Sequence, residues 1–183
     1  SREFLMAILP IVKYGDPILR RKVKLVTDFT NLDNLVKDML DTMGNESGIG
    51  LAANQVGMDM NLLVLDISGF EDEDDVDPRV FVNIDIIKEE GEIEIEEGCL
   101  SIPDIRASIV RAETITIEYQ DLKGNIKTEI FTGLAARVIL HENDHLIGKY
   151  FTDYLPTSQK TVIQKRLKEI SETGFPSVSV TLT

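Results

Sequence analysis

Two histidines four residues apart form the strongest chemical pattern in this sequence. His141 and His145 bracket the pentapeptide HENDH and are the only histidines in the chain. In a helix, residues i and i+4 share one face, so both imidazoles can bind the same metal ion. Glu142 follows the first histidine and is placed to take a proton from a water molecule at that ion. We therefore predict a catalytic metal site rather than a chance pentapeptide on a solvated helix.

The third ligand must come from elsewhere in the chain, because a catalytic site of this kind has three protein ligands and one open position. The single cysteine, Cys99, lies in the segment EGCLS at 97–101. A lone cysteine more often packs as a small hydrophobic side chain. Since the two histidines lack a partner, we interpret Cys99 as the third ligand, with Gly98 allowing the backbone to approach the ion.

A glycine-rich segment, GIGLAANQ at 48–55, is the third candidate for a functional role. Its spacing does not fit a phosphate-binding loop, because no Lys-Ser/Thr pair follows the last glycine. It is either a loop that enters a tight turn or a wall of the active site. In the second interpretation its glycines let backbone amides approach a substrate, and the Gln55 amide donates to a developing oxyanion.

The helices that must position these side chains are predicted from apolar residues at helical spacing. Three segments have this pattern: 31–43, 134–147 and 158–172. Thr30 or Asn31 is expected to cap the first helix, and Gly44 to end it. Gly133 and Gly148 are expected to delimit the second helix, which carries both histidines.

The strands are predicted from alternating or clustered β-branched residues. They occupy 62–67, 79–88, 92–96, 114–119 and 126–131, with a turn at 121–125 and either a short strand or a frayed end at 178–181. Strands in the middle of the chain, with helices before and after them, favour an α+β fold. We predict antiparallel strands packed around a central metal-binding helix, with an N-terminal and a C-terminal helix.

Length and composition narrow the classes of protein further. The 183 residues predict a single catalytic domain, with a cloning remnant at 1–5, an acidic loop at 71–77 and a tail at 174–183. A net charge of −13 argues against a free-standing nucleic-acid binder. One cysteine rules out an internal disulfide, and no apolar run is long enough to span a bilayer. The N-terminal segment does not resemble a signal peptide, so we expect a cytoplasmic protein.

Taken together, the three segments resemble peptide deformylase. That family carries G-Φ-G-Φ-A-A-x-Q, E-G-C-Φ-S and H-E-x-D-H in this order, where Φ is apolar, and this chain has GIGLAANQ, EGCLS and HENDH. The resemblance covers about residues 10–170, and the last helix is similar to that of the bacterial form. It implies a metal-dependent hydrolase that removes the N-formyl group from the N-terminal methionine of newly synthesised proteins and releases formate.

The resemblance also implies the roles of the residues in the three motifs. One divalent ion would be held by Cys99, His141 and His145: Fe2+ in the native state, with Zn2+, Ni2+ or Co2+ able to replace it in a purified sample. Glu142 would deprotonate the attacking water and pass the proton to the departing amine. The oxyanion would be held by the metal, the Gln55 side chain and the backbone N–H of Leu100.

The substrate positions follow from the same resemblance. The backbone around Gly50 would pair with the extended peptide as an added strand. A methionine pocket would be lined by Ile49, Leu134 and Val138, and further peptide-binding or neighbouring positions would be Glu97, Gly98 and Arg106. The partners would be N-formylmethionyl nascent peptides near the ribosome exit, with no nucleic acid, no membrane and a monomeric enzyme.

Two residues depart from the family's pattern or fill a variable position. Asn54 occupies the free position of the first motif, where we expect no effect. Arg137 lies four residues before His141, where an apolar pocket residue is usual. We expect its stem to pack while its head reaches solvent or Asp144; the alternative is that the guanidinium enters the methionine pocket.

Two competing functions remain open on the sequence alone. One is a zinc endopeptidase, in which Glu169 on the last predicted helix would be the third ligand. The other is an acidic metal-buffering or protein-binding module that uses the 71–77 segment. Glu142 argues against pure metal storage, because a buffering site needs no general base.

Overall fold

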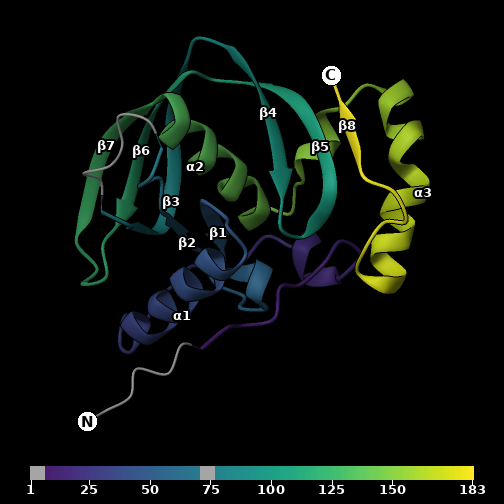
Figure 1. Cartoon of the computed structure of the whole chain (residues 1–183). Coiled ribbons are helices and arrows are strands. Elements are labelled where there is room, and N and C mark those ends of the chain that lie inside the picture. The colour runs from purple at the N-terminus through teal and green to yellow at the C-terminus, as the bar shows by residue number, and fades with distance from the viewer. Residues whose placement is uncertain (1–6, 71–76) are drawn as a thin grey trace.

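The computed structural model describes residues 7–70 and 77–183, which form two β-sheets and three α-helices (Figure 1). The predicted remnant at 1–5 lies outside the described residues, as does the predicted acidic loop apart from Asp77. The helices are α1 (Leu32–Asn45), α2 (Gly133–Leu146) and α3 (Thr157–Thr173). The strands are β1 (Gly50–Ala52), β2 (Leu62–Leu65), β3 (Arg79–Glu90), β4 (Ile93–Cys99), β5 (Ile102–Arg111), β6 (Thr114–Gln120), β7 (Ile126–Thr132) and β8 (Val180–Leu182).

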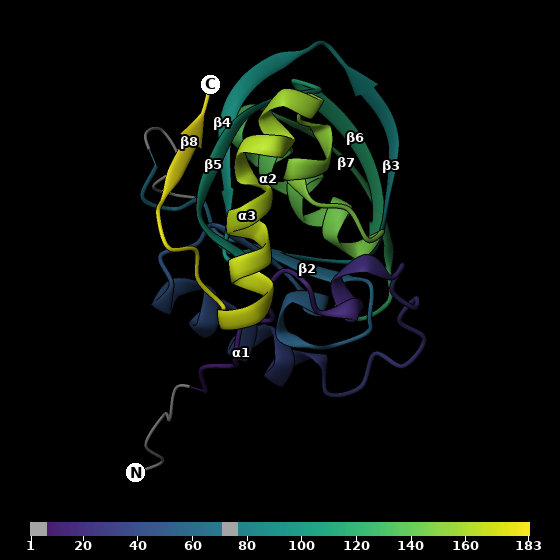
Figure 2. The ribbon, with the colours of Figure 1, turned by 90° about the vertical axis from the view of Figure 1, so that its right-hand side faces the viewer.

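The strands form a five-stranded sheet in the order β1-β2-β3-β6-β7 and a three-stranded sheet in the order β4-β5-β8. Every neighbouring pair is antiparallel except β5 and β8, which are parallel. Helix α2 lies between the two sheets, and α3 packs on the side of the smaller sheet (Figures 1 and 2). The predicted α+β fold with a central helix is therefore confirmed.

Helix α2 is buried on nearly all sides because its two faces meet different partners. Its apolar face, with Val138 and Ile139, packs in one cluster with Phe81 and Ile117 of the larger sheet. The opposite face carries polar side chains that reach β4 and β5. The sequence pattern of α2 is thus not that of a surface helix, which has one solvated side.

The sequence of strand β2 is an uninterrupted apolar run because both of its faces are buried. Leu63 and Leu65 point to the α2 side of the sheet, whereas Leu62 and Val64 join the cluster around α1, which includes Met39. Both faces of the strand are covered, so the alternation of a half-buried strand is absent.

The ends of α1 differ from the prediction. Asn31 is at the N-cap position but is left-handed, with φ of 62°, and its side chain makes no capping bond. Thr30 bonds Asp28 instead. The helix also continues past Gly44 and ends at Asn45.

None of the described helices combines the length and apolar character that crossing a bilayer requires.

Strand β5 is the longest element that the sequence pattern did not predict. Its inward positions alternate as a half-buried strand requires, with Ile105, Ala107 and Ile109 buried. Pro103 and Asp104, which is left-handed with φ of 62°, interrupt the pattern at its start. The tail that follows α3 returns to this strand, because β8 pairs with it and covers one of its edges.

Candidate active site

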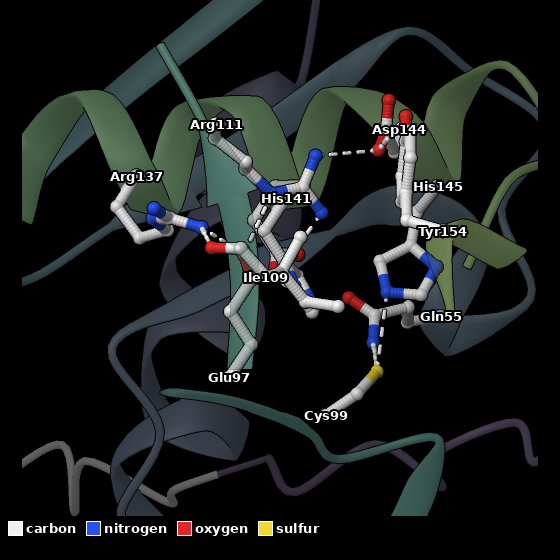
Figure 3. A network of polar contacts seen from close by, with 11 residues as sticks. Gln55, Glu97, Cys99, Ile109, Arg111, Arg137, His141, Asp144, His145 and Tyr154 are labelled. Atoms are coloured by element: carbon white, nitrogen blue, oxygen red, sulfur yellow. Dashed lines mark hydrogen bonds and ion pairs between the residues drawn. The ribbon is translucent and has the colours of Figure 1, made fainter. Parts of the chain in front are cut away.

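The three predicted metal ligands converge from two elements. Cys99 is the last residue of β4, and His141 and His145 lie one turn apart on α2 (Figure 3). One donor atom from each lies within 4.8 Å of the other two, and Cys99 Sγ is 3.1 Å from His145 Nε2. Among the described residues, this is the only group of histidine, cysteine and acidic side chains close enough to hold a metal ion.

This donor set fits a divalent transition-metal ion. One thiolate and two imidazoles suit zinc and iron, and three protein ligands leave a position for water or substrate. Both histidines are buried, and burial lowers the pKa of His145 well below its ordinary value. The imidazole therefore stays neutral at physiological pH, as a metal ligand must.

Glu97 lies directly behind His141. Its Oε1 atom is 2.7 Å from His141 Nδ1, and Arg111 donates to both carboxylate oxygens at 2.6 and 3.1 Å. Burial opposes ionisation, but these hydrogen bonds hold the pKa of Glu97 well below its ordinary range. An ionised carboxylate only accepts, so Nδ1 donates and Nε2 remains free for a metal. Glu97 is therefore a neighbour of a metal ligand, which is one of the two roles expected of it, and its contact with a peptide stays a prediction.

Arg137 occupies neither position that the sequence suggested. Only 3% of it is exposed, so its head does not reach solvent, and it does not bond Asp144. The guanidinium instead donates to Glu97 Oε2 at 2.6 Å and to the carbonyl of Ile109 at 2.8 Å (Figure 3). It also donates to the carbonyl of Ile93 at 2.7 Å. The reason is the packing of the fold: the polar face of α2 lies against the two strands that present these acceptors.

Arg111 and Tyr154 are site residues that sequence reasoning missed, and Asp144 was considered there only as a partner of Arg137. Asp144 accepts from Arg111 Nη1 at 2.7 Å and from the Tyr154 hydroxyl at 2.7 Å. Arg111 thereby links this aspartate of the HENDH motif to Glu97. A usable signal was present, since Arg111 falls on an inward position of β5, in step with Ile109. A charged side chain at an inward position requires a buried partner.

Glu142 has the properties of a group that exchanges protons near neutral pH. It is 4% exposed, and burial raises its pKa to about 7. Its Oε1 atom lies 3.6 Å from His141 Nε2. Within residues 7–70 and 77–183, its Oε2 atom has no hydrogen-bond partner. A buried carboxylate oxygen left free beside the ligands is available to a water molecule.

Gln55 is brought to the metal ligands by the glycine-rich segment. Its Oε1 accepts from the backbone N–H of Ala52 at 2.9 Å, which turns the amide nitrogen toward the site. Nε2 donates to Ser101 Oγ at 3.1 Å and lies 3.5 Å from Cys99 Sγ. Ser101, the last residue of the EGCLS motif, was not singled out in the sequence. Leu100 lies between Cys99 and Ser101, in the turn after β4.

Asn54, from which we expected no effect, makes a defined structural contact. It is fully buried, and its Nδ2 donates to the carbonyl of His145 at 2.7 Å. This bond joins the glycine-rich segment to the C-terminal turn of α2.

The predicted pocket residues share one apolar cluster. Ile49 and Leu134 pack against the cluster that contains Val138. Arg106 pairs with Glu96 at 2.5 Å on the solvent side of the smaller sheet. A Cβ atom on Gly98 would lie 2.5 Å from Arg106 Nη1, so this guanidinium covers the backbone just before Cys99. Their contacts with a peptide stay predictions.

The similarity of this chain to known proteins identifies its family. The family model described as polypeptide deformylase matches residues 8–161. The chain belongs to the peptide deformylase family. Peptide deformylase of Flavobacterium johnsoniae is 46% identical in an alignment 177 positions long, which covers 90% of this chain and 90% of that protein.

Solved deformylase structures agree with this fold. The enzyme of Thermus thermophilus has a TM-score of 0.83 at 38% identity and covers 90% of this chain and 98% of its own. The enzyme of Legionella pneumophila has a TM-score of 0.82 at 37% identity, and the match covers 92% of this chain and 98% of the Legionella chain. Membership gives the chain the activity of the deformylase family, the metal-dependent removal of the N-formyl group from peptides. Cys99, His141 and His145 form a metal site typical of deformylases.

The endopeptidase alternative is wrong. Glu169 is not part of the metal-ligand group, and its carboxylate on α3 accepts from the backbone N–H of Ser177 in the tail at 2.5 Å. The metal-buffering alternative fails on the same family assignment.

Proposed function

We propose that this deformylase removes the formyl group from the N-terminal methionine of newly synthesised proteins with Cys99, His141 and His145 as the ligands of one Fe2+ ion. The observation that carries this is the convergence of a single thiolate and two imidazoles beside a buried carboxylate oxygen of Glu142 that has no hydrogen-bond partner in the described part of the chain. When bound, the ion supplies Lewis acidity to the site. The donor set accepts Zn2+, Ni2+ or Co2+ as well, so a purified sample can carry another ion.

Glu142 is the proposed general base and acid. With a pKa raised to about 7 by burial, its carboxylate can take a proton from the attacking water and return it to the departing amine. Hydrolysis adds the elements of water across the formyl C–N bond, so the products are formate and a free amino terminus.

The oxyanion that forms during attack requires donors close to the ligands. We assign this role to the Gln55 side-chain amide and to the backbone N–H of Leu100. Gln55 is held in place from two sides, through its contacts with Ala52 and Ser101. A donor fixed before the reaction stabilises developing charge without a cost for reorganisation.

The peptide is proposed to bind as an added strand beside β1. This three-residue strand stands at the end of the larger sheet, with β2 as its neighbour. Gly50 would supply backbone hydrogen bonds, as an edge strand does in β-augmentation. The methionine side chain would lie among Ile49, Leu134 and Val138, with Gly98 and Arg106 along the other side of the peptide.

The setting of the reaction is proposed from the family and the charge. We propose a single catalytic domain that acts as a monomer in the cytoplasm on nascent chains near the ribosome exit. Its net charge of −13 supports an enzyme that binds no nucleic acid directly.

Formate release tests this proposal. Protein loaded anaerobically with one equivalent of Fe2+ is expected to release formate from a formyl-methionyl tripeptide, and far more slowly from a formyl-glutamyl tripeptide. The acetyl-methionyl tripeptide is the matched control and should release nothing. Equal turnover of the methionyl and glutamyl peptides would contradict the pocket, and absence of formate release would contradict the reaction.

A further inference from the structure

The Glu97 carboxylate is shared by three side chains from two elements. Oε1 accepts from His141 and Arg111, and Oε2 accepts from Arg111 and Arg137. Arg111 belongs to β5, whereas the other two donors lie on α2. Each carboxylate oxygen therefore has two donors, and its orientation is set by all of them together.

Arg137 and His141 are related by the helix itself. They are four residues apart on the same face of α2, and each bonds a different oxygen of one carboxylate. Glu97 thus lies along the helix axis as a bridge between consecutive turns. If Arg137 is removed, Oε2 loses its contact with α2, and the carboxylate can rotate away from His141 Nδ1.

Arg137 also joins the helix to the backbone of both strands. Its Nη1 and Nη2 atoms donate to the carbonyls of Ile109 on β5 and Ile93 on β4. The metal ligands are divided between these same elements, with Cys99 at the end of β4 and the histidines on α2. The distance from the thiolate to the imidazoles therefore depends on how α2 is held against β4.

Arg137 also balances the charge of the buried cluster. Glu97 and Asp144 are two buried anions, and Arg111 and Arg137 are two buried cations that pair with them. Without Arg137 the cluster would hold one uncompensated negative charge, which is costly in a buried site.

We propose that Arg137 is a positioning residue of the metal centre: it fixes the Glu97 carboxylate that orients His141, and it holds α2 against the strand that carries Cys99. This inference rests on the metal centre of the proposed function but not on the substrate. It gives a role to Arg137, which stands on α2 at a position where an apolar pocket residue was expected.

The test is the rate at which cobalt leaves the loaded protein. Arg137→Met keeps the length of the side chain and removes its charge and donors. Transfer of Co2+ to a chelator is expected to be about 10–100-fold faster than in the parent, the usual effect of losing a partner behind a metal ligand. The ligand-field absorption of bound Co2+ should shift, and the KM for a formyl-methionyl peptide should stay at the parental value.

Arg166→Met is the matched control, because Arg166 also donates to backbone carbonyls, those of Val162 and Val178, but lies on α3 away from the ligands. Its release rate and spectrum should equal those of the parent. If Arg137→Met has the parental release rate and spectrum, the inference is wrong, whatever happens to its melting temperature. If the parent itself does not hold one equivalent of Co2+, the failure belongs to the proposed metal centre.

A second variant decides the case in which Arg137→Met does not fold. Arg137→Lys keeps the positive charge, but an ammonium group cannot span Glu97 and both carbonyls at once. Faster release of Co2+ from this variant supports the positioning role. Release at the parental rate overturns it.

Discussion

The backbone of Gly50 passes so close to Val138 that a Cβ atom at residue 50 would lie 2.4 Å from Val138 Cγ1. The same atom would lie 2.9 Å from Cγ of Glu142. Strand β1 therefore crosses α2 in direct contact with both the proposed base and the proposed methionine pocket. Only glycine permits this approach, so the motif's second glycine has a steric reason.

Gly50→Ala is expected to impair both folding and catalysis. The added methyl group must displace Val138 and Glu142, which should lower the free energy of unfolding by roughly 1–3 kcal/mol. The value of kcat/KM for a formyl-methionyl peptide should fall as well. Urea unfolding and formate release measure the two effects.

Gly44→Ala is the control for this substitution. Gly44 lies within α1, and a Cβ atom there meets nothing within 4 Å. Alanine should therefore stabilise the protein by roughly 0.5–1 kcal/mol and leave formate release unchanged. Equal behaviour of the two variants would show that the close approach at residue 50 is not important.

Glu142→Gln tests the proton-transfer role. The amide keeps the size of the side chain but cannot accept a proton, so kcat should fall by at least ~100-fold, the usual scale for loss of a general base. Metal content should remain at one equivalent. Glu118→Gln, on the exposed side of β6, should have parental activity. A Glu142→Gln enzyme that turns over near the parental rate would assign the proton transfer to another group.

Leu134→Phe tests the methionine pocket. A larger side chain beside Ile49 and Val138 should narrow the pocket and lower kcat/KM for formyl-methionyl peptides about tenfold, with a smaller loss for formyl-alanyl peptides. Leu25→Phe is the control, because Leu25 is 65% exposed. If Leu134→Phe lowers kcat/KM equally for the formyl-methionyl and the formyl-alanyl peptide, the residue does not line the pocket.

The sequence was sufficient for the metal ligands and the helices because each depends on local spacing. His141 and His145 are one turn apart on any helix, and Cys99, the single cysteine, was singled out because the two histidines lacked a third ligand. The helix that carries the histidines was predicted at 134–147 and is observed at Gly133–Leu146.

The partners of buried charges were not accessible from local spacing. Arg137 meets Glu97 40 residues away and Arg111 meets Asp144 33 residues away, and both pairings depend on how β4 and β5 lie against α2. That arrangement in turn requires β5, which Pro103 and Asp104 obscured at its start. Local patterns specify elements, whereas ion pairs between elements require the packed fold.

Cobalt substitution tests the proposed ligand set most directly. A cobalt–thiolate bond gives an intense near-ultraviolet charge-transfer band that nitrogen and oxygen ligands do not. Cys99→Ser should abolish this band, weaken metal retention and remove formate release, whereas Glu169→Ala should leave all three intact. Formate release that survives the cysteine substitution and is lost with the glutamate would contradict the assignment of Cys99, His141 and His145 as the metal ligands.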